Sequence, residues 1–303
     1  PYFAGAVEST ASSGGQIMPP VMGAGAFIMA ETLGIPYSEI MISAIIPALL
    51  YYLAVMLMVD FEAVKEGLSG YPRSQLPRLK TVLLYSGHQL IPLVVLIYFL
   101  VVLQTSVIRA ALWSIAAAFV TSLVKRESRM GPRKVGLAFY QGAINAMEIG
   151  ATCACAGIVI GILSLTGLGI KVSTIIISLS GGHLFLALIL TMFISIILGM
   201  GIPTVGAYVI CAAVTAPALT KMGVPPMAAH FFVFAGITPP VCNAAFAAAA
   251  IAQANVWKVG FTAVKLGFAA YLVPYLFVYG PSLLMLDTWS TIALTVVTAA
   301  AGT

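Results

Sequence analysis

Side chains that carry oxygen gather at two places in this sequence where prolines interrupt an apolar segment. They are Ser9, Thr10, Ser12, Ser13 and Gln16 near the start, and Thr204, Thr238 and Asn243 later. Oxygen ligands suit hard cations, but Ca²⁺ sites usually include several carboxylates, and Glu8 is the only carboxylate close by. The pattern therefore favours a monovalent cation, Na⁺, although each hydroxyl could equally cap a helix end.

The two interruptions share the pattern I-x-P-P-V, at 17–21 and at 237–241. Adjacent prolines remove two backbone donors, and the first proline of each pair disfavours helical geometry in the residue before it. Unpaired backbone groups in lipid cost several kcal/mol, so a broken membrane helix is expected only where it lines a cavity or binds something. Two broken helices at matching places in two halves of a chain indicate the binding site of a transporter.

The composition is that of a membrane protein with several spans. Of its 303 residues, 61% are hydrophobic and 8% are charged, whereas about 25% are charged in an average soluble domain. The apolar runs are long and continuous, which favours helices over the alternating segments of a β-barrel. The formal net charge of +5 fits basic loops beside a membrane better than binding to nucleic acid.

The apolar segments predict the order of the spans after the first interruption. A full span at 39–59 is followed by a two-span hairpin at 86–103 and 107–124. The basic stretches on either side of this hairpin belong in the cytoplasm by the positive-inside rule. We expect one span with a lead-in helix at 135–168 and a long segment at 261–286 that is interrupted by Pro274 and by Gly280-Pro281.

Two further apolar segments, 184–198 and 204–220, are too short to cross a membrane. At 1.5 Å per residue they would reach about 22 and about 26 Å, less than the hydrocarbon core of about 30 Å. The sequence GMGIPT at 199–204 joins them with the spacing of a tight turn. We expect a re-entrant hairpin here, followed by a half-helix at 226–235 that leads into the second interruption.

Three long motifs resemble the large membrane subunit of tripartite ATP-independent periplasmic (TRAP) transporters. In chain order they are GAVESTASSGGQIMPPVMGAGAF, LGMGIPTVGAYVICAAVTAPALTKMGVPP and FAGITPPVCNAAFAAAA. The similarity extends over essentially the whole chain and is greatest to the fused form that works with TAXI-type binding proteins. It implies an all-α polytopic membrane protein, an inverted-repeat elevator transporter with a re-entrant hairpin and two discontinuous helices.

The resemblance also implies a function: uptake of small organic acids, coupled to Na⁺ and without enzymatic activity. A TAXI-type periplasmic solute-binding protein would deliver the acid, and a small membrane subunit or fused upstream helices would complete the carrier. The expected location is the cytoplasmic (inner) membrane of a bacterium or archaeon. Because residue 1 is Pro and the first interruption follows at once, we expect that the sequence lacks an upstream part.

In the family, ions lie where hairpin tips meet broken helices. Carried over to this sequence, one set of Na⁺ ligands is Gly199, Gly201, Thr204, Gly236, Thr238 and Pro239. The other set, facing a hairpin upstream of residue 1, is Ser12, Ser13, Gly14, Gly15 and Gln16. Contacts to the substrate are expected from Glu8, Pro19, Pro203 and Asn243.

The same resemblance divides the chain into a mobile transport domain and a scaffold. The transport domain would comprise an incomplete first repeat at 1–36 and the hairpin with the second broken helix at 171–256. The scaffold would comprise 37–170, with its cytoplasmic basic loops, and the C-terminal helices of 257–303.

Two other functions stay open at this point. Re-entrant loops also form the filters of ion channels, although such filters usually come from symmetric subunits and the repeat here is internal. The GLSG sequence at 67–70 resembles the G-x-S-G of intramembrane serine proteases, but it lies in a charged loop. Glu148, alone in an apolar segment, could couple a proton or pair with a base or a helix end.

Overall fold

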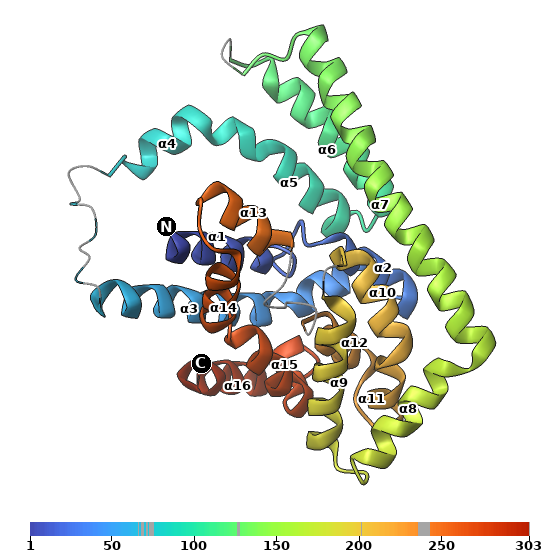
Figure 1. Cartoon of the computed structure of the whole chain (residues 1–303). Coiled ribbons are helices and arrows are strands. Elements are labelled where there is room, and N and C mark those ends of the chain that lie inside the picture. Colours follow the sequence, from blue (N-terminus) through green and yellow to red (C-terminus); the bar gives the residue numbers. More distant parts are fainter. Residues whose placement is uncertain are drawn as a thin grey trace. The chain divides into compact units, whose positions relative to one another are not determined.

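A computed structural model of the chain describes residues 1–65, 67, 70, 72, 76–125, 128–200, 202–235 and 243–302. These residues form helices joined by turns, with no strand among them (Figure 1). The chain divides into two compact units, and each is described by itself. The first unit comprises residues 1–35, 39–62 and 151–303, and the second comprises 36–38 and 63–150.

The first unit contains most of the helices. Complete within it are α1 (Tyr2–Gly14), α2 (Ala24–Leu33), α8 (Leu168–Leu179), α9 (Leu184–Gly199), α10 (Thr204–Val214), α11 (Ala216–Lys221), α12 (Pro226–Ala235), α13 (Asn243–Ile251), α14 (Val256–Leu266), α15 (Ala269–Tyr279), the 3₁₀-helix η4 (Pro281–Leu284) and α16 (Trp289–Gly302). Most of α3 (Tyr37–Lys65) and the C-terminal part of α7 (Pro132–Thr166) also belong to this unit.

The second unit is a helical hairpin followed by the first part of α7. Its helices are α4 (Leu79–Ser86), the 3₁₀-helix η2 (Gly87–Leu90), α5 (Ile91–Ile97), the π-helical turn η3 (Tyr98–Val102) and α6 (Val107–Ser122). The two arms pack through stacked rings of Phe99 and Trp113, 5.7 Å apart, and the Ser114 hydroxyl donates to the Pro92 carbonyl at 2.9 Å. These contacts confirm the predicted hairpin with its turn at 104–106, although of its two arms only the first is part of a stretch long enough to cross a membrane.

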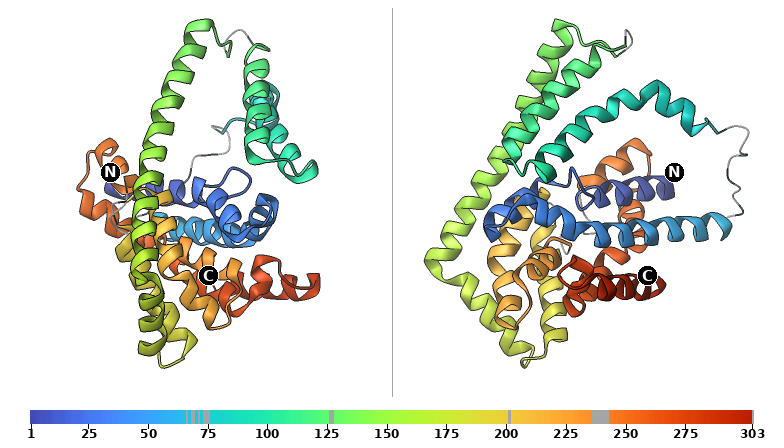
Figure 2. Two further views of the ribbon diagram at one scale, coloured as in Figure 1. Left: turned by 90° about the vertical axis from the view of Figure 1, so that its right-hand side faces the viewer. Right: turned by 180° about the vertical axis from the view of Figure 1, so that it is seen from behind.

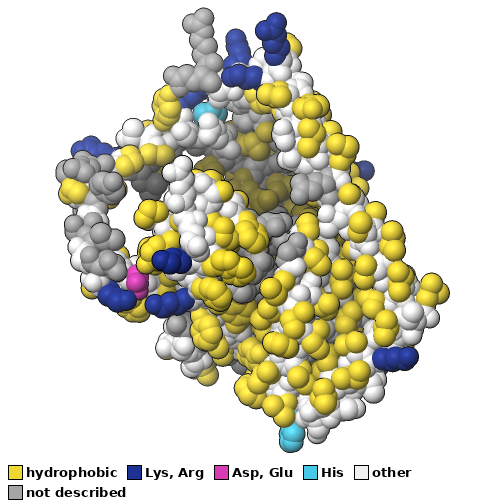
Figure 3. Space-filling model, viewed as in Figure 1, with side chains coloured by type: hydrophobic (Ala, Val, Ile, Leu, Met, Phe, Trp, Pro, Cys, Tyr) yellow, Lys and Arg dark blue, Asp and Glu magenta, His cyan; other side chains and the backbone are white. Residues whose placement is uncertain are grey.

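Within the described residues, five helical stretches are long and apolar enough to cross a membrane. They are Tyr37–Lys65, Lys80–Val102, Pro132–Thr166, Thr204–Lys221 and Val256–Tyr279. The expectation that segment 204–220 is too short to cross is therefore wrong, because α10 and α11 together form a helical stretch of 18 residues. Hydrophobic side chains cover much of the face seen in Figure 3, over α8 and α9 among others, whereas Lys and Arg gather at a few places such as the connection between α6 and α7. The predicted class, an all-α polytopic membrane protein, is confirmed.

Small residues bring α1 close to α13 and α14 (Figure 2). Ala6 of α1 is fully buried against Ala248 and Ala249 of α13 and Val259 of α14. A Cβ atom at Gly5 would lie only 3.3 Å from the Ala248 carbonyl oxygen. Small side chains allow helix backbones to approach closely, which is the usual basis of helix packing in membranes. Helices α13 and α14, which are far from α1 in the sequence, therefore pack directly against the helix that leads into the first interruption.

The predicted hairpin is formed by α9 and α10, which pack against each other. Its first arm ends at Gly199 and its second arm begins at Thr204, as the GMGIPT sequence predicts. The second arm is interrupted once more, where α10 gives way to α11 at Thr215 and Ala216, just before Pro217. A buried Tyr208 on α10 connects the hairpin to α12, because its hydroxyl and His230 Nδ1 lie 2.7 Å apart in a hydrogen bond.

We expect Tyr208→Phe to destabilise the protein by about 1–3 kcal/mol, because the His230 nitrogen loses its partner inside the core. The measurement is the melting temperature of the purified protein in detergent. Tyr279→Phe is the matched control, since Tyr279 lies on α15 with 57% of its surface exposed. Equal melting temperatures for the two variants would contradict a stabilising role for the Tyr208–His230 pair.

Two further predicted details of the spans are wrong. The segment 261–286 is interrupted at Gly280 and Pro281, as predicted, but its other break lies at Gly267 and Phe268, between α14 and α15, and Pro274 lies inside α15. At Gly267 the chain approaches α1 so closely that a Cβ atom would lie 3.2 Å from the Thr10 methyl group, so tertiary packing rather than proline sets the break. Residues 135–166 belong to one continuous helix of 35 residues, α7, instead of a span with a separate lead-in helix, and Leu168 already begins α8. Its glycines weaken a helix by only about 1 kcal/mol each and do not end it.

Candidate functional site

The first predicted interruption is present between α1 and α2. Helix α1 ends at Gly14 and α2 begins at Ala24, and the chain between them turns back on itself. The turn is closed by the Gly23 amide, which donates to the Gln16 carbonyl at 2.8 Å. Met22 has a positive φ of 39°, and the peptide bond between Pro19 and Pro20 is cis. The apolar segment is thus divided into two helices at the residues that the sequence predicts.

The last carbonyls of α1 accept hydrogen bonds from the turn and from α3. The Tyr51 hydroxyl donates to the Thr10 carbonyl at 2.7 Å, and the Tyr52 hydroxyl donates to the Ala11 carbonyl at 2.9 Å. The carbonyls of Ser12, Ser13 and Gly14 accept from the amides that follow in the turn. Each carbonyl oxygen has two lone pairs, so a carbonyl that accepts one hydrogen bond can also bind a cation.

The charge distribution at this helix end favours a cation. The C-terminus of a helix carries about half a negative charge from the aligned peptide dipoles. No basic residue lies in the last turn of α1 to neutralise it. The Thr10 hydroxyl donates to the carbonyls of Ala6, at 2.8 Å, and Ala263, at 3.2 Å, and so ties the helix end to α14. The C-terminal end of α1 is therefore held in place by a hydrogen bond to α14, and no basic residue in its last turn neutralises its partial negative charge.

Gly14 is the point of closest contact between α1 and the two tyrosines. A Cβ atom at this position would lie 2.3 Å from Tyr51 Cε1 and 3.0 Å from Tyr52 Cζ. These separations are far below van der Waals contact, so only glycine fits between the helix end and the rings. The sequence interpretation assigned Gly14 to cation binding, and the structure shows in addition that it is required by packing.

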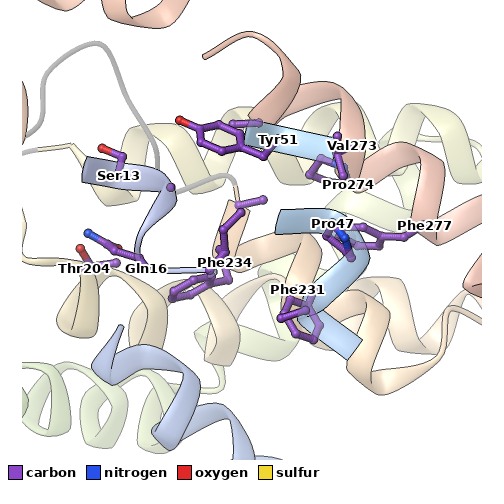
Figure 4. A pocket seen from close by; sticks show the side chains of 15 residues that line it. Ser13, Gln16, Pro47, Tyr51, Thr204, Phe231, Phe234, Val273, Pro274 and Phe277 are labelled. Atoms are coloured by element: carbon purple, nitrogen blue, oxygen red, sulfur yellow. The ribbon is translucent and has the colours of Figure 1, made fainter. Parts of the chain in front are cut away.

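A cavity of about 50 Å³ lies beside this helix end (Figure 4). The predicted residues Ser13, Gly14 and Gln16 line it from the first interruption, and Thr204 lines it from the start of α10. The rest of its wall is mainly apolar: Ile17, Ala44, Pro47, Tyr51, Phe231, Phe234, Ala235, Ala270, Val273, Pro274 and Phe277. The cavity thus joins the carbonyl end of one broken helix to the amide end of one hairpin arm.

The family model described as "Tripartite ATP-independent periplasmic transporter, DctM component" matches residues 1–292. The chain belongs to the DctM family. It is therefore the large permease component of a TRAP transporter, a secondary transporter subunit and a multi-pass membrane protein. TRAP transporters combine the DctM component with a periplasmic binding protein and a small membrane subunit. No curated protein matches the DctM chain.

The second predicted interruption of this DctM chain lies largely outside the described residues. Helix α12 ends at Ala235 and α13 begins at Asn243, whose side chain is not described. The predicted ligands Gly236, Thr238 and Pro239 fall between them, and Gly201 of the hairpin tip also lies outside the described residues. The serine of the GLSG sequence, Ser69, does so as well. The role of these residues stays a prediction.

The remaining predicted residues in the described part of the DctM chain do not line the cavity. Glu8 is exposed on α1, where its carboxylate accepts a hydrogen bond from the Ser12 hydroxyl at 3.3 Å. The others lie in the turn after α1 or at the hairpin tip: Gly15, Pro19, Gly199 and Pro203. Among the described residues, no group of three or more His, Cys, Asp and Glu side chains could hold a metal ion.

Sequence reasoning missed the α3, α12 and α15 side chains that complete this site. Tyr51 and Tyr52 cap the end of α1, and Phe231 and Phe277 form part of the cavity wall. The sequence does contain a signal for the two tyrosines, because they are adjacent in the middle of a predicted span. A hydroxyl buried in a membrane helix needs a hydrogen-bond partner. The aromatic residues of α12 and α15 gave no comparable signal in a chain this rich in them.

Proposed function

We propose that this DctM chain carries small organic acids into the cell together with Na⁺, after a TAXI-type periplasmic protein delivers them. The observation that supports this most is the cavity shared by the C-terminus of α1 and the N-terminus of α10. The first helix end is negative and the second is positive. A cation and a carboxylate can therefore bind side by side, each facing the helix end of opposite sign.

In this proposal the ligands of Na⁺ are backbone carbonyls and neutral side chains. Ser13, Gly14 and Gln16 supply oxygen atoms from the first interruption, and Thr204 supplies its hydroxyl from the hairpin. The other predicted ligands complete the coordination: Ser12, Gly15, Gly199, Gly201, Gly236, Thr238 and Pro239. The set contains no carboxylate, which suits a monovalent ion better than Ca²⁺.

Coupling follows from the short distance between the two charges. A bound Na⁺ attracts the carboxylate of the substrate in a low-dielectric setting, where opposite charges interact several times more strongly than in water. Binding of either partner therefore raises the affinity for the other. We further propose that the hairpin and the broken helices move together, as an elevator, in the cytoplasmic membrane.

Reconstitution of the complete transporter in liposomes tests this function. Uptake of the delivered acid is expected only when both an inward Na⁺ gradient and the loaded binding protein are present. A K⁺ gradient of the same size is the control for membrane potential and osmotic effects. Flux that proceeds without the binding protein, or that ignores the Na⁺ gradient, would overturn the proposal.

We expect Thr204→Val to raise the Na⁺ concentration for half-maximal uptake about tenfold, since loss of one good ion contact costs about 1.4 kcal/mol or more. Thr238→Val, at the second interruption, is expected to act in the same direction. Thr174→Val is the matched control, because the exposed Thr174 hydroxyl donates only to its own helix, at the Ile170 carbonyl. Unchanged Na⁺ activation in Thr204→Val would remove this residue from the ligand set.

A further inference from the structure

The cavity at the first interruption has two unlike ends. Ser13, Gln16 and Thr204 lie together on one side of it, next to the turn after α1 (Figure 4). Phe231, Phe277 and other apolar side chains of α3, α12 and α15 lie on the opposite side. A ligand that fills this cavity must therefore be polar at one end and apolar at the other.

The apolar end is a rigid wall. Phe231 and Phe277 are 4% and 2% exposed, and their rings meet edge to face with centroids 6.3 Å apart. Phe234, 4% exposed, packs edge to face on Tyr208 and lies so close to Gly25 of α2 that a Cβ atom there would be 2.6 Å from its ring. These phenylalanine side chains carry no polar group and are packed too tightly to move aside. They therefore offer no hydrogen-bond partner to a ligand.

No charged side chain is available at the apolar end. The described lining residues include none, and neither do the stretches of sequence that supply them: 13–17, 44–51, 231–235 and 270–277. A second carboxylate on the ligand would therefore be buried without a counter-charge. Burial of an unpaired charge is among the most costly events inside a protein.

The size of the cavity favours a small apolar group on the ligand. Its volume is about 50 Å³, and Phe231, Val273 and Phe277 all line it. Because protein interiors are closely packed, a bulky group such as an aromatic ring would have to displace these side chains. A short aliphatic tail meets this limit best.

We propose that this transporter is selective for short aliphatic monocarboxylates, with the alkyl tail among Phe231, Phe277 and their neighbours and the carboxylate at the polar end. The selectivity rests on the proposed function, since it concerns the substrate of the same site. It distinguishes monocarboxylates from dicarboxylates of equal length. The membrane component thus selects among acids independently of the binding protein.

Butyrate and succinate test the selectivity, because both have four carbons and differ by one carboxylate. Binding to the purified complete transporter, in nanodiscs with Na⁺ at neutral pH and without the binding protein, is followed by calorimetry. We expect butyrate to bind with at least about tenfold higher affinity than succinate. Equal affinities, tighter binding of succinate, or no binding of butyrate would each overturn the inference.

Variants of the apolar wall give a second test. Val273→Ala and Phe277→Ala enlarge the cavity and are expected to shift the preferred tail length from butyrate toward hexanoate. Val273→Ala removes little volume and remains informative where Phe277→Ala fails to fold. Phe261→Ala is the control, because Phe261 is 62% exposed on α14 and does not line the cavity. An unchanged butyrate-to-hexanoate ratio in Val273→Ala would contradict the placement of the tail.

Uptake in liposomes separates this inference from the proposed coupling. Transport that depends on Na⁺ together with tighter binding of succinate would overturn the selectivity alone. A preference for butyrate together with uptake that ignores Na⁺ would support the selectivity and overturn the coupling.

Discussion

Gly14→Ala is expected to abolish most Na⁺-driven uptake. The added Cβ atom would lie 2.3 Å from Tyr51 Cε1 and 2.8 Å from Tyr51 Cδ1, and Tyr51 is 98% buried, with 2% of its surface exposed. Either α1 or the ring must move, and both carry the hydrogen bond between the Tyr51 hydroxyl and the Thr10 carbonyl. Overpacking of this kind costs about 1–3 kcal/mol, and it displaces the carbonyls proposed to bind the cation.

The measurement is the initial rate of uptake against Na⁺ concentration, with the amount of folded protein in the liposomes determined by size-exclusion chromatography. Gly142→Ala is the matched control, because Gly142 lies in α7 and a Cβ atom there meets nothing within 4 Å. Normal Na⁺ activation in a folded Gly14→Ala protein would show that the end of α1 takes no part in cation binding.

The double variant Tyr51→Phe with Tyr52→Phe has the second largest expected effect. It removes the hydroxyls that donate to the Thr10 and Ala11 carbonyls at 2.7 and 2.9 Å. Loss of a buried hydrogen bond to a carbonyl costs about 1–3 kcal/mol. We expect a lower melting temperature without Na⁺ and a larger stabilisation by Na⁺ than in the unmodified protein, because the freed carbonyls gain more from a cation.

The comparison requires thermal unfolding of the purified transporter with NaCl and with choline chloride at equal ionic strength. Tyr140→Phe provides the control, since Tyr140 is 64% exposed on α7. If the double variant melts like the control in both salts, the two tyrosines neither stabilise α1 nor compete with the cation.

The first interruption and the hairpin could be predicted because their causes are local. Glycine and proline act on the backbone of their own residue and its neighbours, so the end of α1 and the tip between α9 and α10 are encoded where they occur. The two predicted sets of Na⁺ ligands lie far apart in the sequence. The structure brings members of both sets together, because Ser13, Gly14 and Gln16 line the same cavity as Thr204.

The wall of the site could not be predicted, because it depends on contacts between distant segments. Tyr51 reaches a carbonyl 41 residues away, and in a chain that is 61% hydrophobic an aromatic residue carries little information about its neighbours. The break at Gly267 has the same origin, since it reflects a close approach to Thr10 rather than a local breaker. Pro274, which locally predicts a helix break, lies inside α15 instead.

The meeting of Thr10, Tyr51 and the segment around Gly267 has a consequence for protein engineering. Thr10 contacts the Ala263 carbonyl through its hydroxyl and the Tyr51 hydroxyl through its carbonyl, and a Cβ atom at Gly267 would lie 3.7 Å from that same Tyr51 oxygen. In a chimera that takes only the first interruption from a related protein, Thr10 would no longer face the Tyr51 and Gly267 segments with which it packs. Functional recombination requires that all three segments come from one parent.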